Sequence, residues 1–571
     1  MNVAAKMPTV PELLEPASLI FDSLLGANPF VELNRNEIIQ AYTELATTLM
    51  ARPERLWSYF THLAADLVSI AAGTTDFAPE PSDRRFSDPT WDENAIYRRV
   101  RQSYLAWRQA AYGLLASTDA NGPAWKSSAR QRFALQLVVE ALAPTNTLMG
   151  NPAALKRAFE TGGMSLVNGL RNFLDDLRNN GGMPAQVDKR PFKLGQTIAA
   201  SPGAVVYRDD LYEVLQYTPT TQQVHERPLI LIPPQINKFY VMDLAPHRSL
   251  TEYAVSHGIQ FFTVSWRNPG PADRDKGLDD YVAAVERAGT VVREITGSDE
   301  LNLLAVCAGG VTTALTVGHL AALGDRRINS TTLLVTMLDS DEPSMSGMFA
   351  TEETVQSTCA RVRQKGVLDA AAMSRLFAWL RPNDLVWNYW VNNYLMGKDP
   401  APFDILYWNS DGTNLPAALH AGFLDQLVRN RLLEPNKVSI LGTPISLRAV
   451  KHDLYLVSGQ TDHICSWRAG HRAARLFGGR AEFVLSSSGH VQSLVCPPGN
   501  PKATYLTNPH LGATPDEWLA SATEHKGSWW EHWLPWLEMR SGERRSAPET
   551  LGAPQFPPLE PAPGTYVRQA A

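Results

Sequence analysis

The chain has 571 residues, of which 44% are hydrophobic and 19% charged, a composition typical of a globular protein with a large core and two domains. Its 52 basic and 58 acidic residues give a net charge of −6, which provides no basis for binding DNA or RNA. The N-terminus lacks a signal-peptide pattern and no run of about 18 apolar residues occurs, so we expect neither export by that route nor a membrane-spanning helix.

The first 200 residues are predicted to form a mostly helical domain. Apolar residues recur at spacings of three and four in five segments, 36–50, 53–72, 94–117, 129–142 and 165–179. Asn151-Pro152 is a typical helix start, and Gly162-Gly163 interrupts the helical pattern. This part of the chain contains no catalytic constellation, and its tryptophans at helical spacing are typical of a core.

The pattern changes near Gly181-Gly182 to short apolar runs that alternate with helical segments. We predict a hairpin over 204–217, two crossover helices at 278–295 and 309–323, and six strands at 229–232, 260–264, 301–306, 332–338, 453–457 and 482–485. Continuous apolar strands that alternate with helices indicate a mostly parallel sheet covered on both faces. Residues 201–571 are therefore predicted to form an α/β domain.

The interval between the strands at 332–338 and 453–457 is too long for a loop in a compact domain, because it exceeds a hundred residues. Its sequence is helical and aromatic, above all at 376–394. We predict a cap at about 340–450 over the carboxyl ends of the strands, where ligands bind in open α/β sheets. A Trp-rich helix and an extended, Pro-rich tail from about residue 542 are expected to follow.

A nucleophile is predicted at Cys307, which follows a buried strand and precedes Gly309, Gly310 and a helix. Strand, sharp turn and helix match the nucleophile elbow G-x-S-x-G of the α/β-hydrolase fold, with Cys for Ser and Ala305 for the first Gly. An apolar cysteine is usually only a small core residue. The setting of Cys307 between a strand and a glycine pair favours the catalytic interpretation.

Two later loops carry an acid and a base. Asp462 follows the predicted strand 453–457, and His490 follows 482–485. In this fold the acid and the base follow the nucleophile in that order, each after a strand. Each residue alone is a weak signal, since an Asp in such a loop is usually a turn residue and the chain has 13 histidines. Their order and placement together predict a catalytic triad with Cys307.

The chemistry of these residue types gives each a role. His490 would accept the Cys307 proton and Asp462 would hold the imidazole in the useful tautomer. Backbone N–H groups of Ala308 and of the loop at Gln235 and Ile236 would bind the oxyanion. A Cys acyl-enzyme is a thioester, so acyl groups exchange cheaply with coenzyme A thioesters, and transfer to a hydroxyl is favoured over hydrolysis under a cap that excludes water.

The cysteines also bear on metals and compartment. The chain has four cysteines, Cys307, Cys359, Cys465 and Cys496. None of them belongs to a C-x-x-C pair. This spacing disfavours a zinc site and a disulfide framework alike, so we expect no metal and a reducing cytoplasm.

The chain resembles the polyhydroxyalkanoate synthases, most closely the class II type that polymerises medium-chain 3-hydroxyacyl-coenzyme A. The resemblance covers most of the chain and rests on six blocks, PPQINKFY at 233–240, CAGG at 307–310, RPNDLVWNYW at 381–390, FDILYWN at 403–409, DH at 462–463 and SGHVQS at 488–493. Ala305 departs from the family's Gly, which leaves the catalytic rate open but not the roles of the residues.

The resemblance implies Cys307, Asp462 and His490 as the catalytic residues. It implies that Arg381 and His463 serve the coenzyme A path or support the site. It also implies that Thr336, Ser488 and Gln492 influence monomer choice. Gln235, where class I enzymes have Trp, points to class II.

The activity implied by the resemblance is polymerisation of (R)-3-hydroxyacyl-coenzyme A into polyhydroxyalkanoate. Coenzyme A leaves as product, so no cofactor is expected, and the partners are the substrate and the growing polyester chain. The resemblance also implies a homodimer in the cytoplasm at the surface of polyester granules, an N-terminal region that associates with granules and their proteins, and a cap with open and closed forms.

Three points stay open at the level of sequence. The 3-hydroxyl that attacks the next thioester could be activated by His490 or by Asp462. Two alternative interpretations are a Cys-variant esterase or thioesterase on the same fold and a catalytically silent granule-coat protein. The intact Cys, Asp and His set argues against the silent granule-coat protein. The preferred monomer length depends on a pocket built from residues far apart in the chain.

Overall fold

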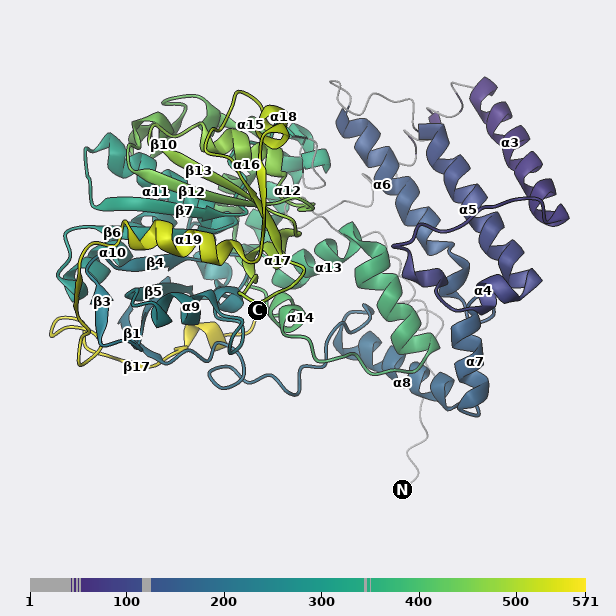
Figure 1. Ribbon diagram of the computed structural model, residues 1–571, viewed down its shortest axis with the longest axis horizontal. Coiled ribbons are helices and arrows are strands. Elements are labelled where there is room, and N and C mark those ends of the chain that lie inside the picture. The colour runs from purple at the N-terminus through teal and green to yellow at the C-terminus, as the bar shows by residue number, and fades with distance from the viewer. Residues whose placement is uncertain are drawn as a thin grey trace. The chain divides into compact units, whose positions relative to one another are not determined.

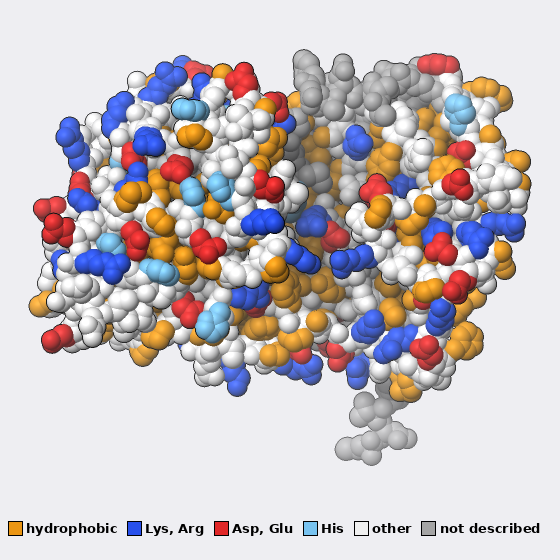
Figure 2. Space-filling model, in the orientation of Figure 1, with side chains coloured by type: hydrophobic (Ala, Val, Ile, Leu, Met, Phe, Trp, Pro, Cys, Tyr) orange, Lys and Arg blue, Asp and Glu red, His pale blue; other side chains and the backbone are white. Residues whose placement is uncertain are grey.

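The computed structural model describes residues 53–115, 125–342, 347–349 and 351–571, together with residues 43, 46, 47 and 50 (Figure 1). The helix predicted at 36–50 lies almost entirely outside these residues. The chain divides into two compact units, the first made of Met1–Asp188 with Ala372–Pro402 and the second of Lys189–Ala371 with Phe403–Ala571. Basic and acidic side chains both occur on the face of each unit seen in Figure 2.

The first unit is helical, as the apolar spacing predicts. Its helices before residue 188 are α3 (Pro53–Ala72), α4 (Thr90–Glu93), α5 (Ala95–Leu115), α6 (Trp125–Ala141), α7 (Pro152–Glu160) and α8 (Met164–Asn179). Asn151 caps α7, because its side chain accepts the Ala154 N–H at 3.1 Å and Pro152 occupies the first helical position. Trp91 and Phe86 anchor an aromatic core between these helices.

Residues 372–402 of the predicted cap pack in this first unit. Gly169 of α8 lacks a side chain where the Tyr394 carbonyl passes, and Tyr394 Oη donates to Asp176 Oδ2 at 2.8 Å. The segment 376–394, predicted to be helical, is interrupted at Arg381, between α13 (Ala370–Leu380) and two π-helical stretches at 383–387 and 390–395. The interruption has a local cause, since the next residue is Pro382 and a residue before proline avoids the helical conformation.

The second unit is built on an eleven-stranded sheet. Its strands in spatial order are β15 (Thr523–Lys526), β14 (Thr504–Thr507), β13 (Ala481–Ser486), β12 (Asp453–Gly459), β7 (Ile328–Leu334), β6 (Leu301–Val306), β4 (Leu229–Ile232), β5 (Phe261–Trp266), β2 (Tyr212–Tyr217), β1 (Gly203–Arg208) and β17 (Glu560–Pro561). The six strands from β13 to β5 are parallel, and the pairs on either side of them are antiparallel. The predicted α/β class is confirmed.

Helices cover both faces of this sheet. On one face α9 (Leu250–Ser256) and α19 (Trp529–Glu538) pack with alternate strand residues into one apolar core, and Figure 1 shows α19 as the yellow helix lying across the strands. The other face carries α10 (Leu278–Thr296), α11 (Ala308–Ala322) and α16 (Trp467–Ala474). The Trp-rich C-terminal helix was predicted, and its indoles at 529, 530 and 533 are buried. The tail after it is extended, as predicted, and adds β16 (Arg544–Ser546) to β3 (Gln223–His225).

One predicted strand is wrong in its position. The strand predicted at 332–338 is β7 at Ile328–Leu334, and Val335 after it has a φ of 43° that ends the strand. The early residues of β7 are polar, but Ser330 Oγ donates to Asn302 Oδ1 of β6 at 2.7 Å, which satisfies both groups inside the sheet. Thr336 therefore lies beyond the carboxyl end of β7 and not within a strand.

The rest of the cap interval belongs to the second unit and contains α12 (Glu352–Lys365), α14 (Asp404–Asn409) and α15 (Ala417–Arg429). Part of it contacts the loop at the carboxyl end of β4. Thr413 N–H donates to the Ile236 carbonyl at 3.0 Å, and Trp408 Nε1 donates to the Lys238 carbonyl at 2.8 Å. No helix among the described residues is long and apolar enough to cross a membrane.

Candidate active site

Cys307 occupies a strained corner between β6 and α11. It has a φ of 50° and a ψ of −119°, a conformation that residues with a side chain rarely adopt. Hydrogen bonds of 2.9 Å on both sides hold the corner, from Cys307 N–H to the Leu334 carbonyl and from Gly310 N–H to the Cys307 carbonyl. This geometry is that of the predicted nucleophile elbow, with the half-buried sulfur at the carboxyl edge of the sheet.

The two glycines of the elbow are required by close packing. A Cβ at position 309 would lie 2.5 Å from the carbonyl oxygens of Ile232 and Pro233, and one at position 310 would overlap the Thr336 side chain. The turn forms with Ala305, fully buried in β6, at the position where the elbow pattern has Gly.

The structure brings His490 and Asp462 to this corner. His490 begins α17 (His490–Leu494) directly after β13, and its Nδ1 donates to Asp462 Oδ2 at 2.7 Å. The imidazole also interacts with the Cys307 side chain. Asp462 Oδ1 accepts the N–H groups of Ile464 at 2.8 Å and Cys465 at 3.0 Å. The three residues therefore form a continuous chain of interactions from carboxylate to sulfur.

The electrostatics of this chain favour charge separation. A hydrogen bond with Cys465 and the nearby His490 hold the pKa of Cys307 well below its ordinary value, against the effect of burial. Burial opposes protonation of His490, but Asp462 and Cys307 outweigh it and raise its pKa well above the ordinary value. Burial also opposes ionisation of Asp462, yet His490 and the two backbone N–H groups keep its pKa lowered. Both directions favour a thiolate beside an imidazolium, which is the reactive form of a cysteine nucleophile.

The loop predicted to supply oxyanion donors is fixed beside the first turn of α11. Gln235 is buried and donates from Nε2 to Thr312 Oγ1 at 3.0 Å, while Trp266 Nε1 donates to the Pro233 carbonyl at 3.0 Å. The Ile236 carbonyl is held by the cap contact described above. Ala308 is the first residue of α11, so its N–H points from a helix N-terminus, where partial positive charge favours an anion.

The remaining predicted site residues fall into two groups. Thr336 packs against Gly310, and the Ser488 carbonyl accepts the Thr461 N–H at 3.2 Å, so both lie next to the elements that carry the triad. His463 follows Asp462 in the same loop, and Gln492 is exposed on α17. Arg381 belongs to the first unit, where it pairs with Asp384.

Sequence reasoning missed Cys465 as a site residue. Its side chain interacts with that of Cys307, although the sequence marked it only as one of four unpaired cysteines. A signal was available in the spacing Asp-x-x-Cys. An Asp that accepts the N–H groups two and three residues later folds the chain back on itself, which returns residue 465 to the side of Asp462.

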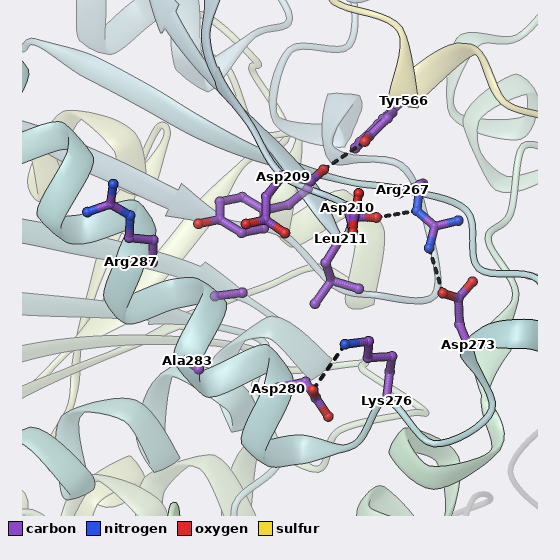
Figure 3. A pocket seen from close by; sticks show the side chains of 12 residues that line it. Asp209, Asp210, Leu211, Arg267, Asp273, Lys276, Asp280, Ala283, Arg287 and Tyr566 are labelled. Atoms are coloured by element: carbon purple, nitrogen blue, oxygen red, sulfur yellow. Dashed lines mark hydrogen bonds and ion pairs between the residues drawn. The ribbon is translucent and has the colours of Figure 1, made fainter. Parts of the chain in front are cut away.

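A cavity of about 590 Å³ lies elsewhere in the second unit, between the β1–β2 turn, the end of β5 and the start of α10 (Figure 3). None of the predicted site residues lines it. Two ion pairs line it, Arg267 with Asp273 at 2.6 Å and Lys276 with Asp280 at 3.4 Å. The candidate site is therefore the elbow at Cys307 and not this cavity.

Known proteins are similar to this chain over nearly its whole length. Residues 82–254 match the family described as the N-terminus of poly-beta-hydroxybutyrate polymerase (PhaC), and residues 228–496 match the alpha/beta hydrolase fold, which confirms the predicted fold. The chain is 45% identical over 548 residues to poly(3-hydroxyalkanoate) polymerase 1 of Ectopseudomonas oleovorans, covering 96% of this chain and 97% of that protein. Polymerase 2 of the same organism is 46% identical, with 95% and 96% covered. The polymerase subunit PhaC of Cupriavidus necator is 38% identical, with 90% and 87% covered.

Proposed function

The chain belongs to the poly(3-hydroxyalkanoate) polymerases, and from that premise we propose that Cys307, His490 and Asp462 carry its polymerisation chemistry. The chain is an acyltransferase that joins 3-hydroxyalkanoate units into a polyester. The observation that supports the assignment of residues is the hydrogen bond between Asp462 and His490, whose imidazole interacts with a sulfur held at a strained corner.

The first step loads an acyl unit from (R)-3-hydroxyacyl-coenzyme A. The Cys307 thiolate attacks the thioester carbonyl, and the N–H groups of Ala308 and of the Gln235–Ile236 loop receive the oxyanion. The bond to the coenzyme A sulfur breaks, and His490 supplies the proton that this leaving thiolate takes up. The enzyme then holds the unit as a thioester on Cys307, with an energy close to that of the substrate.

The second step extends the chain through a hydroxyl group. Asp462 already accepts three hydrogen bonds and its pKa is lowered, so it is a weak base with little room for a further proton. His490, in contrast, is fixed through Nδ1 and keeps Nε2 for the reacting groups. We therefore assign His490 as the base that takes the hydroxyl proton as the new ester bond forms and the thioester bond breaks, with Asp462 orienting it.

The test replaces the nucleophile and follows both products. In Cys307→Ala, release of coenzyme A from a medium-chain 3-hydroxyacyl-coenzyme A and formation of polymer should both disappear, and Cys359→Ala of α12 is the matched control that should keep both. Turnover that persists in Cys307→Ala would refute the assignment. Free hydroxy acid in amounts equal to released coenzyme A, without polymer, would indicate a thioesterase instead.

The setting of the reaction is part of the same proposal. The enzyme would act as a homodimer in the cytoplasm at the surface of polyester granules, where granule proteins are further partners, and it would need no cofactor since coenzyme A leaves as product. The first unit supports contact with an apolar phase, because α8 exposes Val167, Leu170 and Leu174 by 59%, 59% and 40%. Sedimentation with and without granules, and activity after treatment with a chelator, test these points.

A further inference from the structure

Cys465 is a buried thiol at the centre of the catalytic cluster, and none of the steps above uses it. It is 6% exposed and lies in the loop between β12 and α16. Its sulfur, an oxygen of Asp462 and a ring nitrogen of His490 lie within 4.8 Å of one another. The loop cannot swing away easily, because the Cys465 N–H is bound to Asp462 Oδ1 at 3.0 Å.

The sheet order explains why this thiol meets Cys307. Strands β6 and β12 flank β7 on its two sides, and Leu334 at the end of β7 is paired with both Val306, the last residue of β6, and Val457 of β12, which continues to Gly459. Cys307 follows β6 and Cys465 follows β12. The two side chains therefore approach each other from opposite sides of β7 and interact.

The chemistry of the pair fixes which sulfur donates. A thiolate can only accept, and Cys307 is the sulfur that faces the imidazole, so the proton of the pair stays on Cys465. The opposite directions of the two pKa values agree, since the shared hydrogen bond lowers that of Cys307 and raises that of Cys465 well above the ordinary value. Among the described residues, the titratable groups that face Cys307 are Cys465, His490 and Asp462.

We propose that Cys465 is a positioning residue of the polymerase, whose S–H group donates to the Cys307 sulfur, keeps it a thiolate directed at His490 and stays protonated through the cycle. This inference rests on the proposed function. The donor matters most in the extension step. When a hydroxyl attacks the acyl group, the C–O bond forms, the C–S bond breaks and the hydroxyl proton passes to His490, so Cys307 leaves as a thiolate that the Cys465 donor stabilises.

The experiment measures the rate of Cys307 alkylation by iodoacetamide from pH 5 to 10 in the full chain, with the alkylated peptide identified by mass spectrometry. In Cys465→Ala the midpoint should rise by about one pH unit, because a hydrogen bond to a charged group is lost. Cys465→Ser keeps a donor and should restore the midpoint. The kcat for polymerisation should fall about tenfold in the Ala variant, with KM little changed, and recover in the Ser variant.

Two results would overturn the proposal, namely an unchanged midpoint in Cys465→Ala, or an acyl group or alkyl label found on Cys465 before Cys307. If the Ala or Ser variant does not fold, Cys465→Val and Cys465→Thr provide a second pair that differs only by a hydroxyl donor. The alkylation profile does not depend on polymer formation. Failure of the wild-type protein to polymerise would therefore count against the proposed function alone, and an unshifted profile against the role of Cys465 alone.

Discussion

The catalytic edge of the second unit and helix α8 of the first unit use apolar and small residues in opposite ways. At the elbow, the atoms around Gly309 and Gly310 lie so close that neither position has room for a methyl group. On α8, only one face is packed, through Gly169, while Val167 and Leu170 on either side of it are more than half exposed. Close backbone contacts therefore fix the conformation of the elbow, whereas α8 presents a surface that its own unit leaves uncovered.

The largest expected effect is at Asp462. In Asp462→Asn, Oδ1 can still accept the N–H groups of Ile464 and Cys465, so the loop should keep its shape. The new amide would face His490 Nδ1 with a donor, which favours the wrong tautomer, and the rate of coenzyme A release should fall by about 10³ to 10⁴. Since Asp462 supports the imidazolium, the alkylation midpoint of Cys307 should also move up towards the ordinary value for a cysteine.

The matched control for this change is Asp516→Asn, at an exposed carboxylate of α18 (Pro515–Ala520) that pairs with Arg468. It should leave both the rate and the midpoint unchanged. Equal losses of the coenzyme A release rate in the two variants would contradict the orienting role of Asp462.

The next effect concerns packing behind the elbow. Gly310→Ala should reduce the free energy of unfolding by about 3 kcal/mol and lower activity, because its methyl group would overlap the Thr336 side chain. Thr336→Ala in the same chain should recover part of the loss, and a double-mutant cycle followed by denaturant unfolding measures the coupling. Additive effects of the two changes would contradict the close contact.

A third prediction concerns a buried carboxyl on the same unit. Burial raises the pKa of Asp243 to about 6, although Ser201 and Ser249 donate hydrogen bonds to it. The folded state holds this proton more tightly than the unfolded chain does. Protonation of Asp243 therefore adds at most about 3 kcal/mol to the free energy of unfolding, which is present in full at about pH 4 and is lost as pH rises to about 6. The difference in unfolding free energy between wild type and Asp243→Asn, measured from pH 4 to 7, should shift in favour of the variant as pH rises. A constant difference would show that Asp243 does not titrate in this range.

The sequence was most informative where local pattern and packing agree. The strand at 301–306, the corner at Cys307 and the order of Asp462 and His490 could be predicted, because apolar runs, glycines and strand-end loops all point to the same arrangement. The position of β7 could not, because its polar residues are satisfied by Asn302, a partner that only the folded sheet supplies. The spacing Asp-x-x-Cys could place Cys465 beside Asp462, but its approach to Cys307 could not be predicted, since only the folded sheet brings the two residues together across β7.

The first unit shows the same limit in another form. The helical spacing of 372–402 was readable, but its partner was not, because the contact depends on a missing side chain at Gly169 and on the Tyr394 carbonyl more than 200 positions away in the chain. Periodicity states which face of a helix is apolar, and it does not state what covers that face.

The smallest effect on stability is expected on the open face of α8, and it separates the two kinds of packing within one helix. Leu170→Glu should change the free energy of unfolding by less than about 0.5 kcal/mol, since this side chain is 59% exposed. Gly169→Ala, one position earlier, should be strongly destabilising because its methyl group would collide with the Tyr394 backbone. If the exposed face contacts the polyester, Leu170→Glu should also reduce the fraction of enzyme that sediments with amorphous polyester particles several-fold, while turnover of soluble substrate stays the same. Retention of full binding to the particles would show that this face of α8 serves another contact.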